Sequence, residues 1–293
     1  MTPRWTSALV SCLVATVVTG AACAGRSTAT SVPAEASAVD TIGQFVWQDL
    51  VTDDLEASRA FYSELLGWEF ERVTRLGDPY LLARSDFGYI GGITFVERED
   101  PDEPIAQWLS YLSVADVDQT AADLTASGGR VLVEPIDLEN GRAAVGVDPQ
   151  GALVGFVQVG VNAVVPVSGQ SAPAGMFFWR DYLAADAEDA RDFYTALIGL
   201  TADQQARPDL LLHYALRRPG PEAVAGIVPI GSEQVNPNWL PYVRVDDPAG
   251  LAARAQALGG GVLLAPRADV RNGSVAIVTD PGGAAVALQR WPF

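Results

Sequence analysis

The sequence has 293 residues, a length typical of about two globular domains rather than one. Hydrophobic residues make up 49% of it, enough for full cores, and the formal net charge at pH 7 is -17. This charge excludes a nucleic-acid-binding protein, because a polyanion would be repelled where such proteins cluster Lys and Arg.

The first 22 residues differ from the rest and are typical of a secretory signal peptide. A basic start at Arg4 is followed by an apolar stretch over residues 8–18 and by small residues up to Cys23. We therefore predict a signal peptide over residues 1–22 and export of the mature chain. The apolar stretch is short for a membrane span of roughly 20 residues, so a retained anchor is the weaker alternative, beside ordinary cleavage nearby.

Cys23 is expected to be the first residue of the mature chain and its only cysteine, since Cys12 lies within the signal peptide. No intrachain disulfide can then form. The segment resembles a bacterial lipobox, whose cysteine is diacylated, although Gly20 stands where that motif prefers Leu, Val or Ile. We expect lipidation at Cys23 and a place on the extracytoplasmic face of the cell membrane. Residues 23–41, rich in Ala, Ser, Thr and Pro, are predicted to be a flexible tether.

The rest of the chain contains an internal repeat whose copies lie about 132 residues apart. Phe45-Val-Trp-Gln-Asp49 recurs as Phe177-Phe-Trp-Arg-Asp181. Trp108-Leu-x-Tyr111 recurs as Trp239-Leu-x-Tyr242, and Asp148-Pro-x-Gly151 as Asp280-Pro-x-Gly283. Two single-residue gaps align the copies from end to end, which predicts domains over residues 42–160 and 174–293 joined by a linker over residues 161–173.

Each copy is predicted to contain the order strand, helix and three strands twice. In the first copy, the first helix begins at Asp53-Asp54 and ends at Gly67, and the second begins at Asp116 and ends at Gly128. In the second copy, Pro248 follows Asp247 at the matching helix start, where its missing N–H costs nothing. Strands of the first copy are predicted over residues 44–51, 80–84, 90–96, 108–114, 131–133, 143–147 and 153–159.

These motifs resemble the vicinal oxygen chelate superfamily, which includes glyoxalase I, extradiol dioxygenases and bleomycin resistance proteins. The likeness rests on F-V-W-x-D, D-x-E-x-x-x-x-F-Y, W-L-x-Y-x-x-V-x-D-V and D-P-x-G-A. It implies an α+β fold of two tandem domains, in which two βαβββ modules form a half-barrel cup. In family enzymes, His and Glu side chains hold a divalent metal inside that cup.

The resemblance also implies where metal ligands would lie, and the residues there are largely unsuited to a metal. The first-strand position falls at Trp47 and Trp179, and the last-strand position near Gly155 and Ala287. The remaining ligand position falls near Trp108-Leu109 and Trp239-Leu240. The only histidine in the sequence is His213, which we interpret as an ordinary strand residue. We therefore expect no metal and no other cofactor. A hard cation such as Mg²⁺ bound by Asp49 or Asp181 is the weaker alternative.

Aromatic cups with a few polar groups suit a flat or amphipathic organic ligand. Strand alternation means that not all candidates can face inward, and the tryptophans have the alternative of packing between sheet and helix. The candidate ligand-binding residues are Trp47, Asp49, Trp108, Tyr111, Trp179, Asp181, Tyr242 and Arg244.

The preferred hypothesis is an exported, lipid-anchored protein that binds a small organic molecule without a metal. We expect a monomer in which the two domains pair with each other. One alternative is a metal-dependent enzyme of the superfamily, a lyase, isomerase or dioxygenase with an atypical site. The other is a non-catalytic surface interaction protein, since fold alone does not determine chemistry.

Overall fold

The computed structural model describes residues 41–75, 78–98, 105–138, 141–159, 172–207, 212–219, 223–231 and 235–291. They form two eight-stranded mixed sheets, one from each copy of the repeat. The strand orders are β2-β3-β4-β1-β5-β8-β7-β6 and β10-β11-β12-β9-β13-β16-β15-β14, so the two sheets have the same topology. The predicted α+β fold of two tandem domains is therefore confirmed. The predicted signal peptide and lipidated Cys23 lie outside the described residues.

The first domain contains two modules, each with one helix and four strands. The first module is β1 (Phe45–Thr52), α1 (Leu55–Leu66), β2 (Glu69–Arg75), β3 (Asp78–Ser85) and β4 (Gly88–Phe95). The second is β5 (Gln107–Ser113), α2 (Val117–Ala126), β6 (Arg130–Leu138), β7 (Gly141–Val147) and β8 (Leu153–Val159). In the sheet, β1 and β5 pair antiparallel at the centre and join the two modules.

The second domain repeats this plan. Its first module is β9 (Phe177–Ala184), α3 (Ala187–Ile198), β10 (Thr201–Arg207), β11 (Leu212–Arg217) and β12 (Ala223–Pro229). Its second is β13 (Asn238–Arg244), α4 (Pro248–Ala257), β14 (Gly261–Leu264), β15 (Val275–Thr279) and β16 (Ala285–Gln289), with a short 3₁₀ turn over Arg271–Gly273. Among the described residues, no helix is long and apolar enough to span a membrane.

Each of the four α-helices in the described part of the chain begins at an aspartate whose side chain accepts a hydrogen bond from a backbone N–H of the first turn. These N-cap residues are Asp54, Asp116, Asp186 and Asp247. Each cap satisfies an otherwise unpaired N–H and places negative charge at the positive end of the helix. Helices α1 and α3 end at Gly67 and Gly199, which adopt φ values of 71° and 73° that favour glycine.

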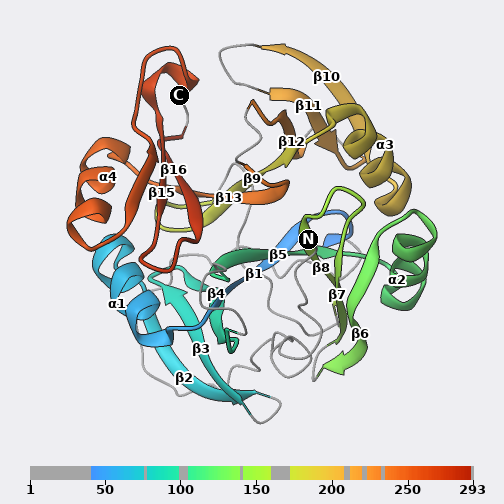
Figure 1. Ribbon diagram of the computed structural model, residues 1–293, viewed down its shortest axis with the longest axis horizontal. Coiled ribbons are helices and arrows are strands. Elements are labelled where there is room, and N and C mark those ends of the chain that lie inside the picture. The colour runs from blue at the N-terminus through green and yellow to red at the C-terminus, as the bar shows by residue number, and fades with distance from the viewer. Residues whose placement is uncertain are drawn as a thin grey trace, which may run out of the picture.

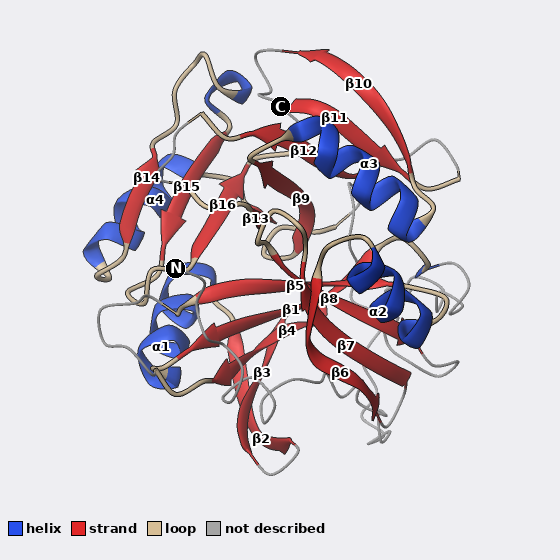
Figure 2. Ribbon diagram, turned by 45° about the vertical axis from the view of Figure 1, so that its right-hand side comes forward, coloured by secondary structure: helices blue, strands red, loops and turns tan. Residues whose placement is uncertain are grey.

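The two domains pack crosswise, so that each helix contacts a helix of the other domain. Figure 1 shows α1 beside α4 on one side of the molecule and α2 beside α3 on the other. The largest apolar cluster joins the first module of domain 1 to the second module of domain 2, and another joins the two remaining modules. Figure 2 shows the helices at the periphery, with the sheets between them. The domain interface is therefore part of the hydrophobic core.

Side chains alternate in direction along the central strands, so each sheet has two faces with different surroundings. On β1, Gln48 and Leu50 face the other domain and the helices, whereas Trp47 and Asp49 face the concave side of the sheet. We call the concave face of the first sheet the first cup and that of the second sheet the second cup. On β9, Tyr182 packs in the interdomain core, so that Asp181 faces the second cup.

Candidate functional site

The second cup contains a buried carboxylate held by an aromatic side chain of the same strand. Trp179 and Asp181 are two residues apart on β9 and so point to the same face. The indole Nε1 of Trp179 donates a hydrogen bond to Asp181 Oδ1 at 2.6 Å. Asp181 is only 1% exposed, whereas Trp179 is half-buried. The carboxylate is therefore buried within the cup, and the aromatic ring beside it is only partly accessible to solvent.

Two further side chains bind the other carboxylate oxygen. The hydroxyl of Tyr242, on β13, donates to Asp181 Oδ2 at 2.7 Å. Arg271 Nη2 donates to the same atom at 2.5 Å, and its Nη1 donates to Gln289 Oε1 at 3.0 Å. The Arg271 guanidinium also lies over the Tyr242 ring, 4.8 Å from its centroid. A cation, a carboxylate, a phenol and an amide thus form one connected network.

Burial and charge shift the titration of this network. Burial raises the pKa of Tyr242 well above its ordinary value, against the lowering effect of the Arg271 charge. Burial alone would lower the pKa of Arg271, but the charge of Asp181, the Tyr242 hydroxyl and the hydrogen bond to Asp181 together more than offset it, so that the pKa is raised. At neutral pH, Arg271 therefore stays positive and Tyr242 stays a neutral hydrogen-bond donor.

The turn that carries Arg271 is conformationally unusual. Arg271 and Asn272 are the only described non-glycine residues with positive φ, at 45° and 53°. Such a backbone costs of order 1–3 kcal/mol per residue in a non-glycine residue, somewhat less for Asn. The Ser274 hydroxyl donates to the Arg271 carbonyl at 2.6 Å and stabilises the turn. The strained turn directs the guanidinium into the cup.

The first cup has the same Trp-Asp pair but different partners. Trp47 Nε1 donates to Asp49 Oδ1 at 2.9 Å, and the Tyr80 hydroxyl donates to the same oxygen at 2.6 Å. Tyr111 lies opposite Trp47 on β5 and is 1% exposed. The remaining lining is largely apolar and includes Leu82 and Val145. At the repeat position of Arg271 the first domain has Glu139, which lies outside the described residues.

The described residues of the two cups do not include the ligands that a transition metal requires. Among the described residues, no group of three or more His, Cys, Asp or Glu side chains comes together. In the second cup the Asp181 carboxylate accepts three hydrogen bonds, one of them from a cation. A metal ion there would be opposed by the positive charge of Arg271. These residues therefore do not fit the metal centre that the fold implies.

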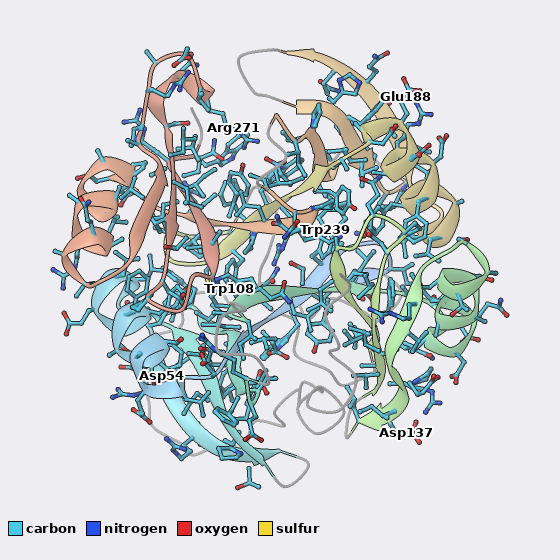
Figure 3. All side chains as sticks on the ribbon, in the orientation of Figure 1. Asp54, Trp108, Asp137, Glu188, Trp239 and Arg271 are labelled. Atoms are coloured by element: carbon cyan, nitrogen blue, oxygen red, sulfur yellow. The ribbon has the colours of Figure 1, made fainter. Side chains whose placement is uncertain are left out.

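Six of the eight sequence-predicted site residues lie in the cups, three in each, and the other two lie elsewhere. Trp47, Asp49 and Tyr111 come together in the first cup, and Trp179, Asp181 and Tyr242 come together in the second. Trp108 lies instead in the domain interface, where its Nε1 donates to the Tyr62 hydroxyl at 3.1 Å. Its repeat counterpart Trp239 donates to Tyr194 at 2.9 Å. In Figure 3, Trp108 and Trp239 lie where the domains meet, whereas Arg271 lies over the second sheet.

Arg244 is the other predicted residue that lies apart from the Asp181 network. Its Nη1 donates to the Ala172 carbonyl at 2.8 Å, so it holds the chain that enters the second domain. The register shift next to Tyr242 lies on the neighbouring strand, where Phe178 is the extra residue of β9, so β13 keeps its alternation. Arg244 therefore starts from the same face as Tyr242, but its guanidinium is bound by the Ala172 carbonyl and not by Asp181.

Sequence reasoning missed Arg271, Gln289 and Tyr80, which complete the two networks. Arg271 precedes Asn272-Gly273, a turn signal that predicts a bend but not the direction of the preceding side chain. Gln289 follows the expected last-strand ligand position, Ala287, by two residues and so lies on the same face. That spacing was the available signal for Gln289. His213 precedes Tyr214, which packs in the core, and therefore faces the second cup.

Comparisons with known proteins agree with this architecture. Residues 41–156 match the model of the Glyoxalase/Bleomycin resistance protein/Dioxygenase superfamily. The chain is 30% identical over 242 residues to the putative glyoxylase CFP32 of Mycobacterium tuberculosis, covering 81% of this chain and 91% of that protein. It is 31% identical over 266 residues to the anthracycline biosynthesis protein DnrV of Streptomyces peucetius, covering 84% and 92%.

Solved structures share the fold at low sequence identity. The Mn(II)-bound glyoxalase from Novosphingobium aromaticivorans superposes with a TM-score of 0.58 at 17% identity, covering 85% of this chain and 82% of that one. An extradiol ring-cleaving dioxygenase from B. fuscum has a TM-score of 0.57 at 16% identity, covering 90% and 75%. Identities this low support the fold alone.

Proposed function

Because this chain belongs to the Glyoxalase/Bleomycin resistance protein/Dioxygenase superfamily, we propose that it binds a small organic molecule in its second cup without a metal ion. We further propose that the protein is exported and anchored to the cell membrane by a lipid on Cys23. The relatives named above have different names, a glyoxylase and an anthracycline biosynthesis protein, so family membership alone does not choose a ligand.

The observation that carries the proposal is the hydrogen bond between Arg271 and Asp181. In metal-bound enzymes of this fold, such as the Mn(II)-bound glyoxalase, the metal supplies positive charge. Here a guanidinium supplies it from the chain itself, fixed by Gln289, Tyr242 and the carboxylate. A guanidinium attracts oxygen atoms of a ligand but has no vacant coordination position at which it could activate them as a metal does. Binding is therefore favoured over metal-dependent catalysis.

The ligand class follows from the groups around this cation. Arg271 has five N–H donors, and the bonds to Asp181 and Gln289 use two of them. A carbonyl, phenolate or carboxylate oxygen of the ligand is the natural acceptor for the others. The half-buried ring of Trp179 gives a flat apolar surface beside it. A planar aromatic molecule with ring oxygens combines both features, and the name of the Streptomyces relative is compatible with such a ligand.

Anthraquinone-2-sulfonate is a suitable probe, because it is planar, carries carbonyl oxygens and lacks the vicinal oxygens that chelate a metal. We expect calorimetry to detect its binding to the mature protein after EDTA treatment. The variant D181N/R271M removes the ion pair with little change in volume, and we expect it to weaken binding at least tenfold. Equal affinity of this variant, or binding only after Mn(II) is restored, would refute the proposal.

A second probe separates binding from an atypical metal site. The absorption spectrum of 4-nitrocatechol changes when its two oxygens chelate a metal. We expect addition of Mn(II) or Fe(II) to the protein to cause no change beyond that of the metal in buffer. A protein-dependent change would favour the metal-dependent enzyme instead.

The location proposal rests on residues 1–22 and Cys23. It is tested by expressing the full chain in a bacterium that processes lipoproteins and separating membranes from soluble protein. We expect the protein in the membrane fraction and the Cys23→Ser variant in the soluble extracytoplasmic fraction. An unchanged distribution of the variant would show that Cys23 does not anchor the chain.

A further inference from the structure

We propose that the groove between helices α2 and α3 is a second ligand site, separate from both cups, and that it binds a small organic amine. The groove lies on the outer side of the domain interface, at the loop that joins β7 to β8. Its volume is about 460 Å³, within the range of small-molecule sites. Among the residues that line it are Ser127, Asp148, Tyr182, Asp189, Phe193 and Ala196.

The internal repeat provides a built-in comparison, because α1 and α4 form the equivalent junction on the other side of the molecule (Figure 1). There, Arg254 Nη2 donates to Glu64 Oε2 at 2.7 Å, and Arg254 Nε donates to the Glu64 carbonyl at 2.7 Å. Leu258 packs against the apolar core beside them. Between these two helices lie an exposed ion pair and a partly buried leucine.

At the α2–α3 junction, smaller residues occupy the same repeat positions. Ser127 corresponds to Leu258, and Ala196 corresponds to Glu64. Asp123 corresponds to Arg254, so the ion pair has no counterpart. The two junctions have the same backbone plan and differ in the side chains that fill them. The side chains that line the groove are therefore particular to this junction.

A buried hydroxyl lies at the base of the groove without a well-placed hydrogen-bond partner. Tyr182 is 0% exposed, and no partner lies at normal hydrogen-bond distance from its hydroxyl, although the Asp148 carboxylate is close enough to act on it. The repeat counterpart is Leu50, which needs none. A buried polar group left unpaired costs about 1–3 kcal/mol, which a ligand group bound there would recover. Burial and the nearby Asp148 carboxylate raise the pKa of Tyr182, so the hydroxyl is neutral at pH 7.

The charge around the groove selects a cation. Asp148 is buried, with Oδ2 accepting from the Tyr194 hydroxyl at 2.8 Å, and exposed Asp189 lies on the rim. Asp189 has no counterpart charge in the other copy, where Ala57 stands. An ammonium group donates to the Tyr182 oxygen and is attracted by both carboxylates. Half-buried Phe193 supplies an apolar wall for the carbon skeleton of the ligand.

Fluorine NMR of the full mature protein tests the site with 4-fluorobenzylamine as probe and 4-fluorophenylacetate as its anionic counterpart. We expect the amine signal to broaden and shift in a saturable manner, and the anion signal to stay unchanged. Tyr182→Phe removes only the hydroxyl and is expected to weaken amine binding about fivefold to tenfold. Because it also removes an unpaired buried group, its melting temperature should be equal to or above that of the wild type.

A second variant blocks the groove from its other wall. Ser127→Leu introduces the residue that fills the α1–α4 junction and is expected to abolish saturable binding. Ala126→Leu makes the same kind of change at the neighbouring exposed residue, outside the groove, and should bind as the wild type does. Binding that is unchanged in both Ser127→Leu and Tyr182→Phe, or equal binding of the anion, would overturn the proposal. Anthraquinone-2-sulfonate binding in the second cup should be unaffected by either variant.

Discussion

Gln48 and Arg180 occupy the same position in the two repeats and bind each other across the domain interface. With its oxygen toward the guanidinium, as the N–H donors of an arginine require, the Gln48 amide accepts from Arg180 Nε at 2.7 Å and Nη2 at 2.8 Å. Its nitrogen then donates to Ser110 Oγ at 2.9 Å. Arg180 is 3% exposed, and no carboxylate among the described residues forms an ion pair with it. The pairing of the domains is therefore chemically asymmetric.

Removing either member of this pair should have unequal effects. Burial lowers the pKa of Arg180 to about 9, so the group is still charged at pH 7. Gln48→Leu leaves that charge without its acceptor and should lower the free energy of unfolding by about 3 kcal/mol or more. Arg180→Met leaves only a neutral amide, which keeps Ser110, and should cost less than about 1.5 kcal/mol. Urea denaturation at pH 7 measures both, and equal losses would contradict the assignment.

The network in the second cup should show strong coupling between Asp181 and Arg271. Arg271→Met leaves the buried carboxylate without its cation and should destabilise the protein by about 3–5 kcal/mol. The double variant D181N/R271M removes both charges and should recover most of that loss. A double-mutant cycle measured by urea denaturation gives the coupling energy directly. Additive losses would show that the two side chains do not interact in solution.

Asp280 should make stability fall as pH rises. Burial raises the pKa of Asp280 above its ordinary value, although backbone N–H groups and Ser58 donate hydrogen bonds to it. A raised folded-state pKa favours the folded protein below the unfolded-state pKa, and that stability is lost as pH rises through the folded-state value. Asp280→Asn should therefore be more stable than the wild type at pH 7, with the difference disappearing in acid. Thermal unfolding between pH 3 and pH 7 tests this, and a pH-independent difference would argue against it.

Of the repeated tryptophans, Trp179 should contribute to ligand binding and Trp239 to stability. Trp179→Phe removes an indole that is half-buried beside the Asp181 carboxylate, so we expect weaker anthraquinone-2-sulfonate binding with little change in stability. Trp239→Phe removes a hydrogen bond to Tyr194 within the interdomain core and should lower stability by about 1–2 kcal/mol while leaving affinity unchanged. Calorimetric titration and urea denaturation of both variants give the comparison. If Trp239→Phe weakened binding more than Trp179→Phe, the division would be wrong.

The sequence allowed most of the fold to be predicted, because capping and repetition are local signals. Asp54, Asp116 and Asp247 begin helices as expected, and Pro248 lies in the first turn of α4. The strand missed in the first copy is β2, Glu69–Arg75, in which Phe70 and Val73 are the only apolar residues. It lies at the edge of the sheet and pairs on one side only, so its sequence needs little apolar pattern.

The site was harder to predict than the fold, because side-chain direction depends on tertiary packing. Trp47 and Trp108 belong to neighbouring central strands and have equal aromatic character, yet one faces the cup and the other faces the partner domain. Their periodicity gives no sign of which face is which. Arg271 enters the cup from a turn with positive φ, where strand alternation gives no guidance. The cation that defines the site was therefore visible only in three dimensions.

Metal analysis of the mature protein, purified without chelator from membranes of its expression host, is the most direct test of the central claim that Arg271 supplies the positive charge of the second cup. We expect transition-metal content well below one ion per chain, unchanged after incubation with Mn(II), Fe(II) or Zn(II) and removal of free metal. One tightly held ion per chain that is lost in the Asp181→Asn variant would contradict it.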